Sequence, residues 1–411
     1  MIAFFCALLL FLDPAPWIGN ISLPTGVIAQ AHPVTQIARA TTTTPQQALE
    51  RLFTSSEIQT DWFIPSFLEQ VPPNQIQAVL SNMASSLGEF QSVRQMDDGF
   101  EVQFTRGTVP AQIRLTADGQ IAGLFFEPPS IPVALDQAIA LLESSPYDTS
   151  FLVTKDGTDV AELNAETPLA VGSTFKLAVL AALKNQIDAG TLSWDTVVEL
   201  QPDLKSLPSG MMQDWPDGSK VTLDTLATLM ISISDNTATD VLIHTIGREN
   251  IEALTERNQP LLTTKEAFTL KNPDNAWLLR RYRNGTIDAR RQVLQDSGDR
   301  PLPSKNTFTN EPVEIDVEWF FTPRELCRLM ETVADLPAMQ INSGAVNPSD
   351  WEQVAFKGGS EPGVLNLTTQ VQNAEGQTYC ISATWNSAEQ PLNEEVLTQL
   401  YRSMISGLAQ S

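Results

Sequence analysis

The order of the expected elements after residue 133 constrains the fold of this 411-residue chain more than any other feature. An amphipathic helix at 134–142 leads to two apolar runs, 151–154 and 160–163, and the Asp-Gly turn between them predicts a β-hairpin. Helical patterns fill the middle of the segment. The chain then ends with three expected strands and a helix, at 353–359, 364–371, 378–385 and 393–408. Two strands before a helical block and three after it predict one antiparallel sheet with helices packed against it, an α+β fold.

The segment before residue 133 predicts a separate, smaller domain, and the length of the chain allows two or three domains. Helical patterns broken by prolines fill 45–87, and Asp-Gly turns then punctuate alternating runs such as 100–104. We expect a small α+β domain at 35–130, with helices before an antiparallel sheet, and a second domain at 133–411. The element order of the small domain resembles the nuclear-transport-factor-like (NTF2-like) class. No cluster of titratable groups marks a catalytic centre in it, so we interpret it as a binding or packing module.

The first 31 residues predict export. Residues 1–12 form an apolar run too short for a bilayer, which needs about 20 residues, and Ala29-Gln30-Ala31 matches a cleavage site. We interpret 1–31 as a signal peptide, although a basic start is missing, and expect a periplasmic or secreted protein. A buried hydrophobic helix is the alternative. No later stretch predicts a membrane span.

Composition excludes several kinds of chemistry. The chain has 25 Lys and Arg against 49 Asp and Glu, a net charge of −24, which argues against a nucleic-acid partner. With only His32 and His244, the sequence has no usual zinc site and little scope for a Ser–His–Asp centre. We expect no metal, no cofactor and a monomer. Once Cys6 is removed with the signal peptide, we expect Cys327 and Cys380 to be buried free thiols, because nothing in the sequence brings them together.

Three short motifs carry chemistry. Ser173 and Lys176 stand three residues apart where a helical run begins, so the amine can reach the hydroxyl, and the helix N-terminus favours developing negative charge. Alone, this pattern is also typical of a serine cap beside a solvated lysine. Two more strings follow in the chain, Ser234-Asp235-Asn236 between helical segments and Lys357-Gly358-Gly359-Ser360 near the end of a strand. Together they point to a serine nucleophile with a lysine base, whose pKa burial and Lys357 would lower.

In these motifs the sequence resembles the class A serine β-lactamases and the penicillin-recognising serine hydrolases, whose set is Ser-x-x-Lys, Ser-Asp-Asn and Lys-Thr-Gly. The resemblance runs from about residue 135 to 411. It implies a β-lactamase/transpeptidase-like fold with helices on both sides of the sheet, and an acyl-enzyme on Ser173 with Lys176 as base and Ser234 as proton relay. The substrate-binding and oxyanion residues that it implies are Asn236, Lys357, Gly358, Gly359 and Ser360.

The sequence departs from this family at two points. Class A enzymes hydrolyse the acyl-enzyme with a glutamate in a Glu-x-x-Leu-Asn string, which is absent here. The nearest carboxylate, Glu266, has the wrong spacing; it is a possible deacylation base, but we favour a first-turn helix glutamate. Gly358 stands where the family has a hydroxyl that binds the substrate carboxylate, and Ser360 could compensate. The combination resembles a divergent branch of the class A fold that includes clavulanic-acid-pathway relatives with esterase-like activity.

An arginine cluster lies in the long segment between the second and third motifs. We interpret it as a solvated helix face paired with local acids, and an anion-attracting lid over the active site is the alternative. The five arginines are Arg280, Arg281, Arg283, Arg290 and Arg291.

These observations predict an exported serine hydrolase of β-lactamase type that acts on a β-lactam or a related amide or ester, with slow deacylation. One alternative is an esterase or peptidase acting on a peptidoglycan-like or metabolite substrate. The other is a binder that is acylated without turnover.

Overall fold

The computed structural model describes residues 43–96, 99–127, 129–298, 300–308 and 311–409, so the expected signal peptide at 1–31 lies outside the described residues. The chain divides into two compact units, Met1–Ile131 and Pro132–Ser411. Among the described residues, no helix has the length and apolar character that a membrane crossing requires.

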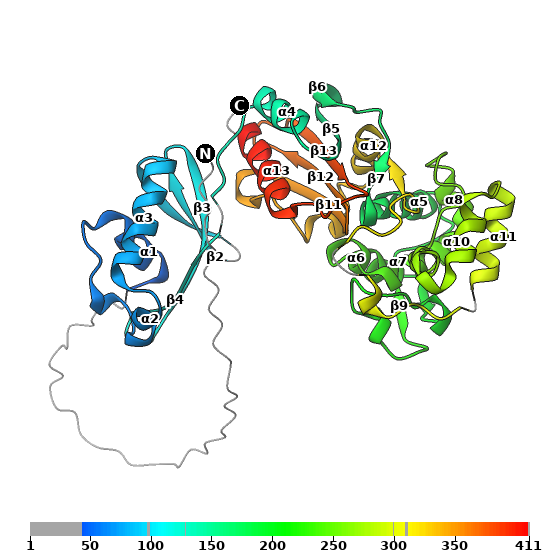
Figure 1. Ribbon diagram of the computed structural model, residues 1–411, viewed down its shortest axis with the longest axis horizontal. Coiled ribbons are helices and arrows are strands. Elements are labelled where there is room, and N and C mark those ends of the chain that lie inside the picture. Colours follow the sequence, from blue (N-terminus) through cyan, green and yellow to red (C-terminus); the bar gives the residue numbers. More distant parts are fainter. Residues whose placement is uncertain (1–42, 97–98, 128, 299, 309–310, 410–411) are drawn as a thin grey trace, which may run out of the picture. The chain divides into compact units, whose positions relative to one another are not determined.

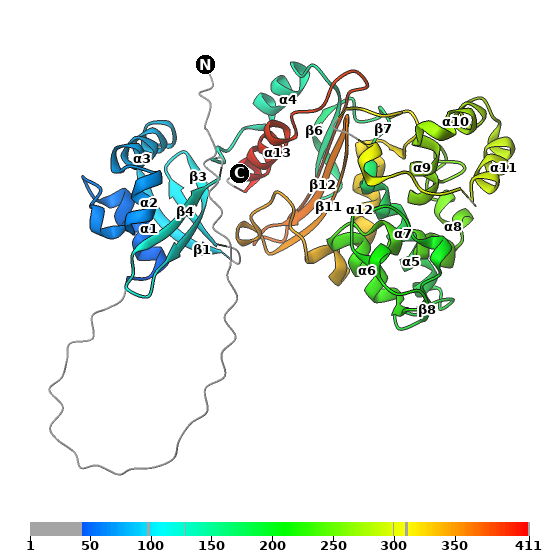
Figure 2. The same cartoon turned by 60° about the horizontal axis from the view of Figure 1, so that its bottom comes forward.

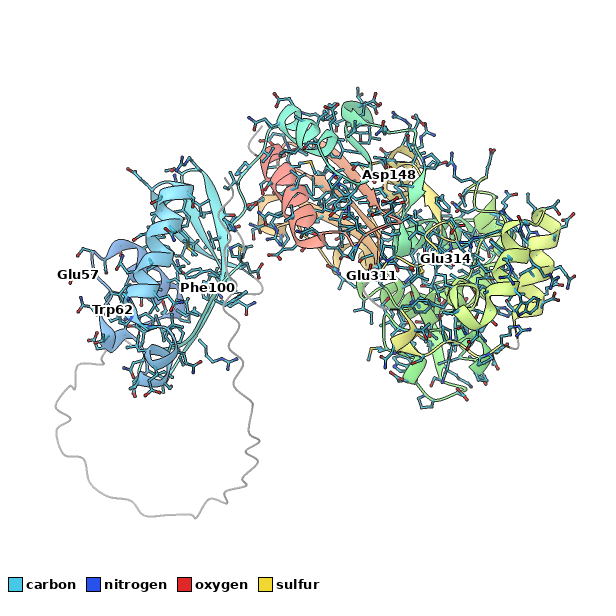
Figure 3. The ribbon with its side chains drawn as sticks, viewed as in Figure 1. Glu57, Trp62, Phe100, Asp148, Glu311 and Glu314 are labelled. Atoms are coloured by element: carbon cyan, nitrogen blue, oxygen red, sulfur yellow. A yellow bond between two sulfur atoms is a disulfide. The ribbon has the colours of Figure 1, made fainter. Side chains whose placement is uncertain are left out.

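In the first unit, helices precede a four-stranded antiparallel meander (Figure 1). A capping box begins the first helix, because the Thr44 hydroxyl accepts the backbone N–H of Gln47 and the Gln47 side chain accepts that of Thr44. Arg51 of this helix stacks on the ring of Trp62. Figure 3 labels Trp62 in the first unit. The elements are α1 (Pro45–Thr54), η1 (Thr60–Trp62), α2 (Pro65–Gln70), α3 (Pro73–Leu87), β1 (Phe90–Met96), β2 (Gly99–Phe104), β3 (Gly107–Leu115) and β4 (Ile121–Phe126).

The second unit contains a five-stranded antiparallel sheet in the order β11-β12-β13-β5-β6. The two early strands form a hairpin at one edge, and the three late strands complete the sheet, since β13 pairs with β5. The predicted α+β fold is therefore confirmed, with strands from both ends of the domain in one sheet. The strands are β5 (Asp148–Lys155), β6 (Thr158–Leu163), β11 (Gln353–Glu361), β12 (Val364–Gln372) and β13 (Thr378–Asn386).

Helices cover both faces of this sheet (Figure 2). On one face, α4 (Leu135–Glu143) and α13 (Glu394–Leu408) bury their apolar stripes in a core that includes Trp385. The Tyr401 hydroxyl in this core donates to Thr369 Oγ1 at 2.8 Å. On the other face, α12 (Pro323–Val333) packs against β12 and β13. The sheet is thus the middle layer of the unit.

The helical block follows β6 and forms a second core around α5, of which residues 176–183 are all buried. A helix buried on all sides fixes the position of its first turn. The helices of the block are α5 (Lys176–Asp188), α6 (Leu223–Ser232), α7 (Asn236–Ile246), α8 (Arg248–Glu252), α9 (Thr264–Lys271), α10 (Ala276–Arg283) and α11 (Ile287–Ser297). Two short pairs of strands are β7 (Leu169–Ala170) with β10 (Phe320–Phe321), and β8 (Val197–Glu199) with β9 (Lys220–Thr222). The 3-10 helices are η2 (Gly172–Phe175), η3 (Pro202–Leu204), η4 (Met212–Asp214), η5 (Pro273–Asn275), η6 (Lys305–Thr307), η7 (Pro337–Gln340) and η8 (Pro348–Asp350).

A disulfide joins Cys327 of α12 to Cys380 of β13, with the two Cα atoms 5.8 Å apart. The expectation of two free thiols was therefore wrong. The reason is tertiary: α12 crosses the sheet face at β13, and this brings together cysteines that are 53 residues apart in the sequence. The bond ties the helix to the sheet.

Candidate active site

Ser173 lies on the one-turn helix η2, which leads directly into α5. On one side of this turn, the rings of Phe175 and Trp319 stack with their centroids 3.9 Å apart. On the other side, β11 passes so close that a Cβ on Gly359 would lie 2.5 Å from the backbone nitrogen of Ser173. Only glycine allows this approach, and it leaves Ser173 half-buried.

Lys176, the first residue of α5, is completely buried. Its Nζ donates to the backbone carbonyl of Ser234 (2.6 Å), to Ser234 Oγ (3.1 Å) and to Asn236 Oδ1 (2.7 Å). Burial first, and then the charge of Lys357, lower the pKa of Lys176 well below its usual value. The lowered pKa favours the unprotonated amine, which is the form that can act as a base.

The Ser234 hydroxyl is held by a strained loop between α6 and α7. Its φ of +58° lies in the left-handed region, which costs a residue other than glycine about 1 kcal/mol. Buried Asp235 stabilises the loop, because its Oδ1 caps α7 by accepting the Ala238 N–H at 2.8 Å and its Oδ2 accepts two backbone N–H groups of the facing loop. Gly210 is required beside it, since a Cβ there would lie 2.3 Å from the Asp235 carboxyl carbon.

Lys357 of β11 brings a second amine to the same hydroxyl. Its Nζ donates to Ser234 Oγ at 3.2 Å and also to the Gly358 carbonyl. Burial lowers the pKa of Lys357 to about 7. Ser234 Oγ therefore lies between the amines of Lys176 and Lys357, where a hydroxyl can transfer a proton from one group to the next.

The remaining residues of the third motif lie beside the nucleophile. A Cβ on Gly172 would lie 3.3 Å from the backbone nitrogen of Ser360, so this N–H belongs to the same small region as Ser173. The Ser360 hydroxyl donates to Glu394 Oε1 of α13 at 2.8 Å. Gly358 supplies no hydroxyl. The structure thus brings these residues together, but the one nearby serine hydroxyl of the motif is engaged with a carboxylate.

Glu266, the possible deacylation base, is held by hydrogen bonds at the start of α9. It closes a capping box at the start of α9, where its Oε2 accepts the Thr263 N–H at 2.8 Å. Its Oε1 accepts from Arg248 Nη2 at 2.7 Å. Glu266 does not line either cavity that contains Ser173. The interpretation of Glu266 as a first-turn glutamate describes this geometry.

Two cavities open at Ser173. One, of about 470 Å³, contains the motif residues Ser234 and Lys357 together with Glu394. The other, of about 320 Å³, is lined by Asn236 and by one face of α9. The aromatic and charged residues of this second cavity are Phe175, Phe268, Phe308, Trp319, Lys271 and Glu361.

The sequence did not predict the charged pair in the second cavity, Lys271 and Glu361. Lys271 Nζ donates to Glu361 Oε2 at 2.6 Å and also to the buried Glu318. The one available signal was position, because Glu361 directly follows the third motif. Nothing in the local pattern connects it to a lysine in another segment.

Three of the five arginines pair with acids. Arg281 bonds to Asp296, Arg291 bonds to Glu252, and Arg283 bonds to both Asp316 and Glu314. Arg290 donates to two backbone carbonyls and stacks on a tyrosine ring. None of the five lines the two cavities at Ser173. This pairing supports the solvated helix face rather than a lid.

Among the described residues, no group of three or more His, Cys, Asp or Glu side chains could hold a metal ion.

The sheet between two helical layers is the architecture of the penicillin-recognising serine hydrolases, and the three motifs meet at the first turn of its buried helix. The chain belongs to this class. Residues 134–404 match the model of the beta-lactamase enzyme family, as the motifs predicted.

Individual relatives are distant. The chain is 28% identical to beta-lactamase VEB-1 of Pseudomonas aeruginosa over 91 residues, which are 22% of this chain and 30% of that protein. It is also similar to the crystal structure of a beta-lactamase from Sphaerobacter thermophilus DSM 20745, with 20% identity, a TM-score of 0.48 and coverage of 67% of this chain and 95% of that one. A class A beta-lactamase representative from Bacteroides cellulosilyticus DSM 14838 has 19% identity, a TM-score of 0.46 and coverage of 67% and 97%.

Proposed function

We propose that this protein is an exported serine hydrolase that forms an acyl-enzyme at Ser173 and acts on β-lactams or related amides and esters. The observation that carries the proposal is the position of Ser234 Oγ between the amines of Lys176 and Lys357, at 3.1 and 3.2 Å. A neutral lysine and a relay hydroxyl supply the base that a histidine-poor chain otherwise lacks.

The proposed acylation uses Ser173 and Lys176, which lie three residues apart where η2 leads into α5. Lys176 takes the proton of the Ser173 hydroxyl as Oγ bonds to the substrate carbonyl carbon. The oxyanion accepts hydrogen bonds from the backbone N–H groups of Ser173 and Ser360, and each such donor is worth roughly 3 kcal/mol. Collapse of the tetrahedral intermediate breaks the bond to the leaving nitrogen or oxygen. The leaving atom receives its proton from Lys176 through Ser234.

Hydrolysis of this acyl-enzyme is proposed to be slow. A class A enzyme uses a loop glutamate for this step, and the nearest loop carboxylate here, Glu266, is bonded to Arg248 and to the start of α9.

The surroundings of the third motif favour an ester over a β-lactam with a ring carboxylate. Gly358 has no hydroxyl, and the Ser360 hydroxyl is bonded to Glu394. A carboxylate at this point repels a substrate anion. An esterase that accepts neutral substrates is therefore the second candidate.

Export is supported by two observations. The first is the apolar run with its small-residue cleavage site at 1–31. The second is the disulfide between Cys327 and Cys380, since such bonds persist mainly in oxidising compartments.

The test is intact-mass measurement after incubation with a penicillin, a cephalosporin and p-nitrophenyl acetate. We expect the mass of the acyl group to be added to the wild type and not to Ser173→Ala. If none of the three gives either an adduct or hydrolysis, the proposed function is overturned. Hydrolysis of the p-nitrophenyl ester without any reaction of the β-lactams would select the esterase.

A further inference from the structure

A buried charged cluster that includes Lys271 and Glu361 lies at the second cavity of Ser173, whereas Ser234 and Lys357 line the first. Lys271, the last residue of α9, donates to Glu361 Oε2 at 2.6 Å and to Glu318. The side chains of Lys271 and Glu318 are 2% and 0% exposed, whereas that of Glu361 is 23% exposed. Glu361 is therefore the member of the cluster that a solvent molecule can reach.

Glu361 shares a cavity with the nucleophile. Both residues line the space of about 320 Å³, together with Asn236 and the aromatic face of α9. Glu361 is next in sequence to Ser360, whose backbone N–H borders the Ser173 turn. A water molecule in this cavity has access to both the Glu361 carboxylate and an acyl group on Ser173.

The cluster keeps one carboxylate ionised. Burial, reinforced by the neighbouring Glu361, raises the pKa of Glu318 well above its usual value, which favours the protonated form of Glu318. Burial alone would raise the pKa of Glu361, but the Lys271 cation and a hydrogen bond with Glu318 lower it below its usual value. Lys271 stays charged, because its two carboxyl partners raise its pKa against the effect of burial. The cluster thus holds one cation and one anion.

We propose that Glu361 is the base that activates the water which hydrolyses the acyl-enzyme, with Lys271 as a positioning residue. This inference rests on the proposed acyl-enzyme at Ser173. In this proposal Glu361, at the end of β11, has the role of the deacylation base. Glu266 of α9 cannot take this role, because its carboxylate is bonded to Arg248.

The step balances without any other reactant. Glu361 takes one proton from water as the water oxygen bonds to the acyl carbonyl carbon, and the oxyanion lies against the N–H groups of Ser173 and Ser360. Collapse breaks the bond between that carbon and Ser173 Oγ. The proton on Glu361 returns to Oγ through solvent or Lys176, and the product leaves as a carboxylic acid. Because an ion-paired carboxylate is a weaker base, this step is slower than with an unpaired glutamate.

The experiment separates acylation from deacylation by single-turnover kinetics with p-nitrophenyl acetate and a penicillin. In Glu361→Gln we expect deacylation to slow by about 100-fold while the acylation rate stays within about threefold, so that the acyl-enzyme accumulates in the mass spectrum. The matched control is Glu266→Gln, which removes a carboxylate of the α9 segment outside the cavity and leaves deacylation unchanged.

Two further measurements distinguish a base from a structural ion pair. Formate added to Glu361→Ala is expected to restore part of the deacylation rate, since it returns a carboxylate to the cavity. The wild-type deacylation rate should be constant at neutral pH and fall only below the usual titration range of a glutamate, as Glu361, whose pKa is lowered, becomes protonated. Both measurements can be made even if Glu361→Gln does not fold, because they use Glu361→Ala and the wild type.

Each outcome decides a separate question. Deacylation that is equal in Glu361→Gln and wild type, with an adduct formed in both, overturns the role of Glu361 and leaves the proposed function intact. Slower deacylation in Glu266→Gln overturns it as well. The absence of any adduct and any hydrolysis in the wild type overturns the proposed function itself.

Discussion

Two buried lysines of the candidate site, Lys176 and Lys271, have pKa values that are shifted in opposite directions. Lys176 is 0% exposed and Lys271 is 3% exposed, so both lose their hydration. Lys176 bonds to Ser234 and Asn236, which are neutral, and its pKa is lowered. Lys271 bonds to two carboxyl groups, and its pKa is raised. Burial is similar for the two lysines. Their different partners therefore favour the unprotonated amine in Lys176 and the cation in Lys271.

The difference shows that the hydrogen-bond partners, rather than burial, determine which charge state each lysine favours. On the motif side, a second cation and neutral acceptors favour the form of Lys176 that can take a proton from Ser173. On the α9 side, the Lys271 cation keeps Glu361 ionised. The two halves of the proposed reaction thus need opposite surroundings, and the molecule separates them in two cavities that meet at Ser173.

The substitution Lys176→Met has the largest expected effect. Removal of the base should lower the acylation rate by about 1,000-fold, and burst kinetics with p-nitrophenyl acetate measure it. The unfolding free energy should fall by only about 1 kcal/mol, because an apolar side chain replaces a group that is already largely uncharged. An acylation rate within tenfold of the wild type would identify another base.

The same substitution on the other side, Lys271→Met, should act on stability. It leaves two buried carboxyl groups without their cation, and we expect the unfolding free energy to fall by about 3 kcal/mol in urea denaturation. The loss should be larger at pH 8 than at pH 5, because carboxyl groups with raised pKa values in the folded state stabilise it when protonated and lose that contribution as the pH rises. Adding Glu361→Gln should recover part of the loss. If Lys271→Met is as stable as the wild type, the Lys271 cation does not stabilise the two carboxyl groups. The contrast between Lys271 and Lys176 would then be wrong.

How far the sequence predicted this arrangement depends on separation along the chain. Ser173 and Lys176 lie on one helical turn, so their spacing alone indicated a pair. The strands and the early hairpin were predictable because alternation and Asp-Gly turns are local signals. By contrast, Lys271 and Glu361 are 90 residues apart, and their contact depends on how α9 packs near the end of β11. The pairing of Cys327 with Cys380 was missed for the same reason.

The contribution of the second motif lysine can be read from a pH profile. Its charge lowers the pKa of Lys176, so Lys357→Gln should move the acid limb of the acylation rate to higher pH by about one unit. Because the pKa of Lys357 is about 7, its charge acts only at lower pH, and the two profiles should converge above about pH 8. Lys184→Gln, on the same helix α5 as Lys176 but paired with Asp188, is the control and should leave the profile unchanged. If the acid limbs of Lys357→Gln and the wild type coincide, burial alone lowers the pKa of Lys176.

The smallest expected effect concerns Glu394, a carboxylate that lines the cavity of the motif lysines. Glu394→Gln keeps an oxygen that can accept the Ser360 hydroxyl and removes only the charge. Since Glu394 is exposed, we expect kcat/KM for an anionic penicillin to rise by about threefold, with no change for neutral p-nitrophenyl acetate. The gain should shrink in high salt, which screens an exposed charge. An equal change for both substrates would mean that Glu394 acts by holding Ser360 in place, and the preference for neutral esters would then need another cause.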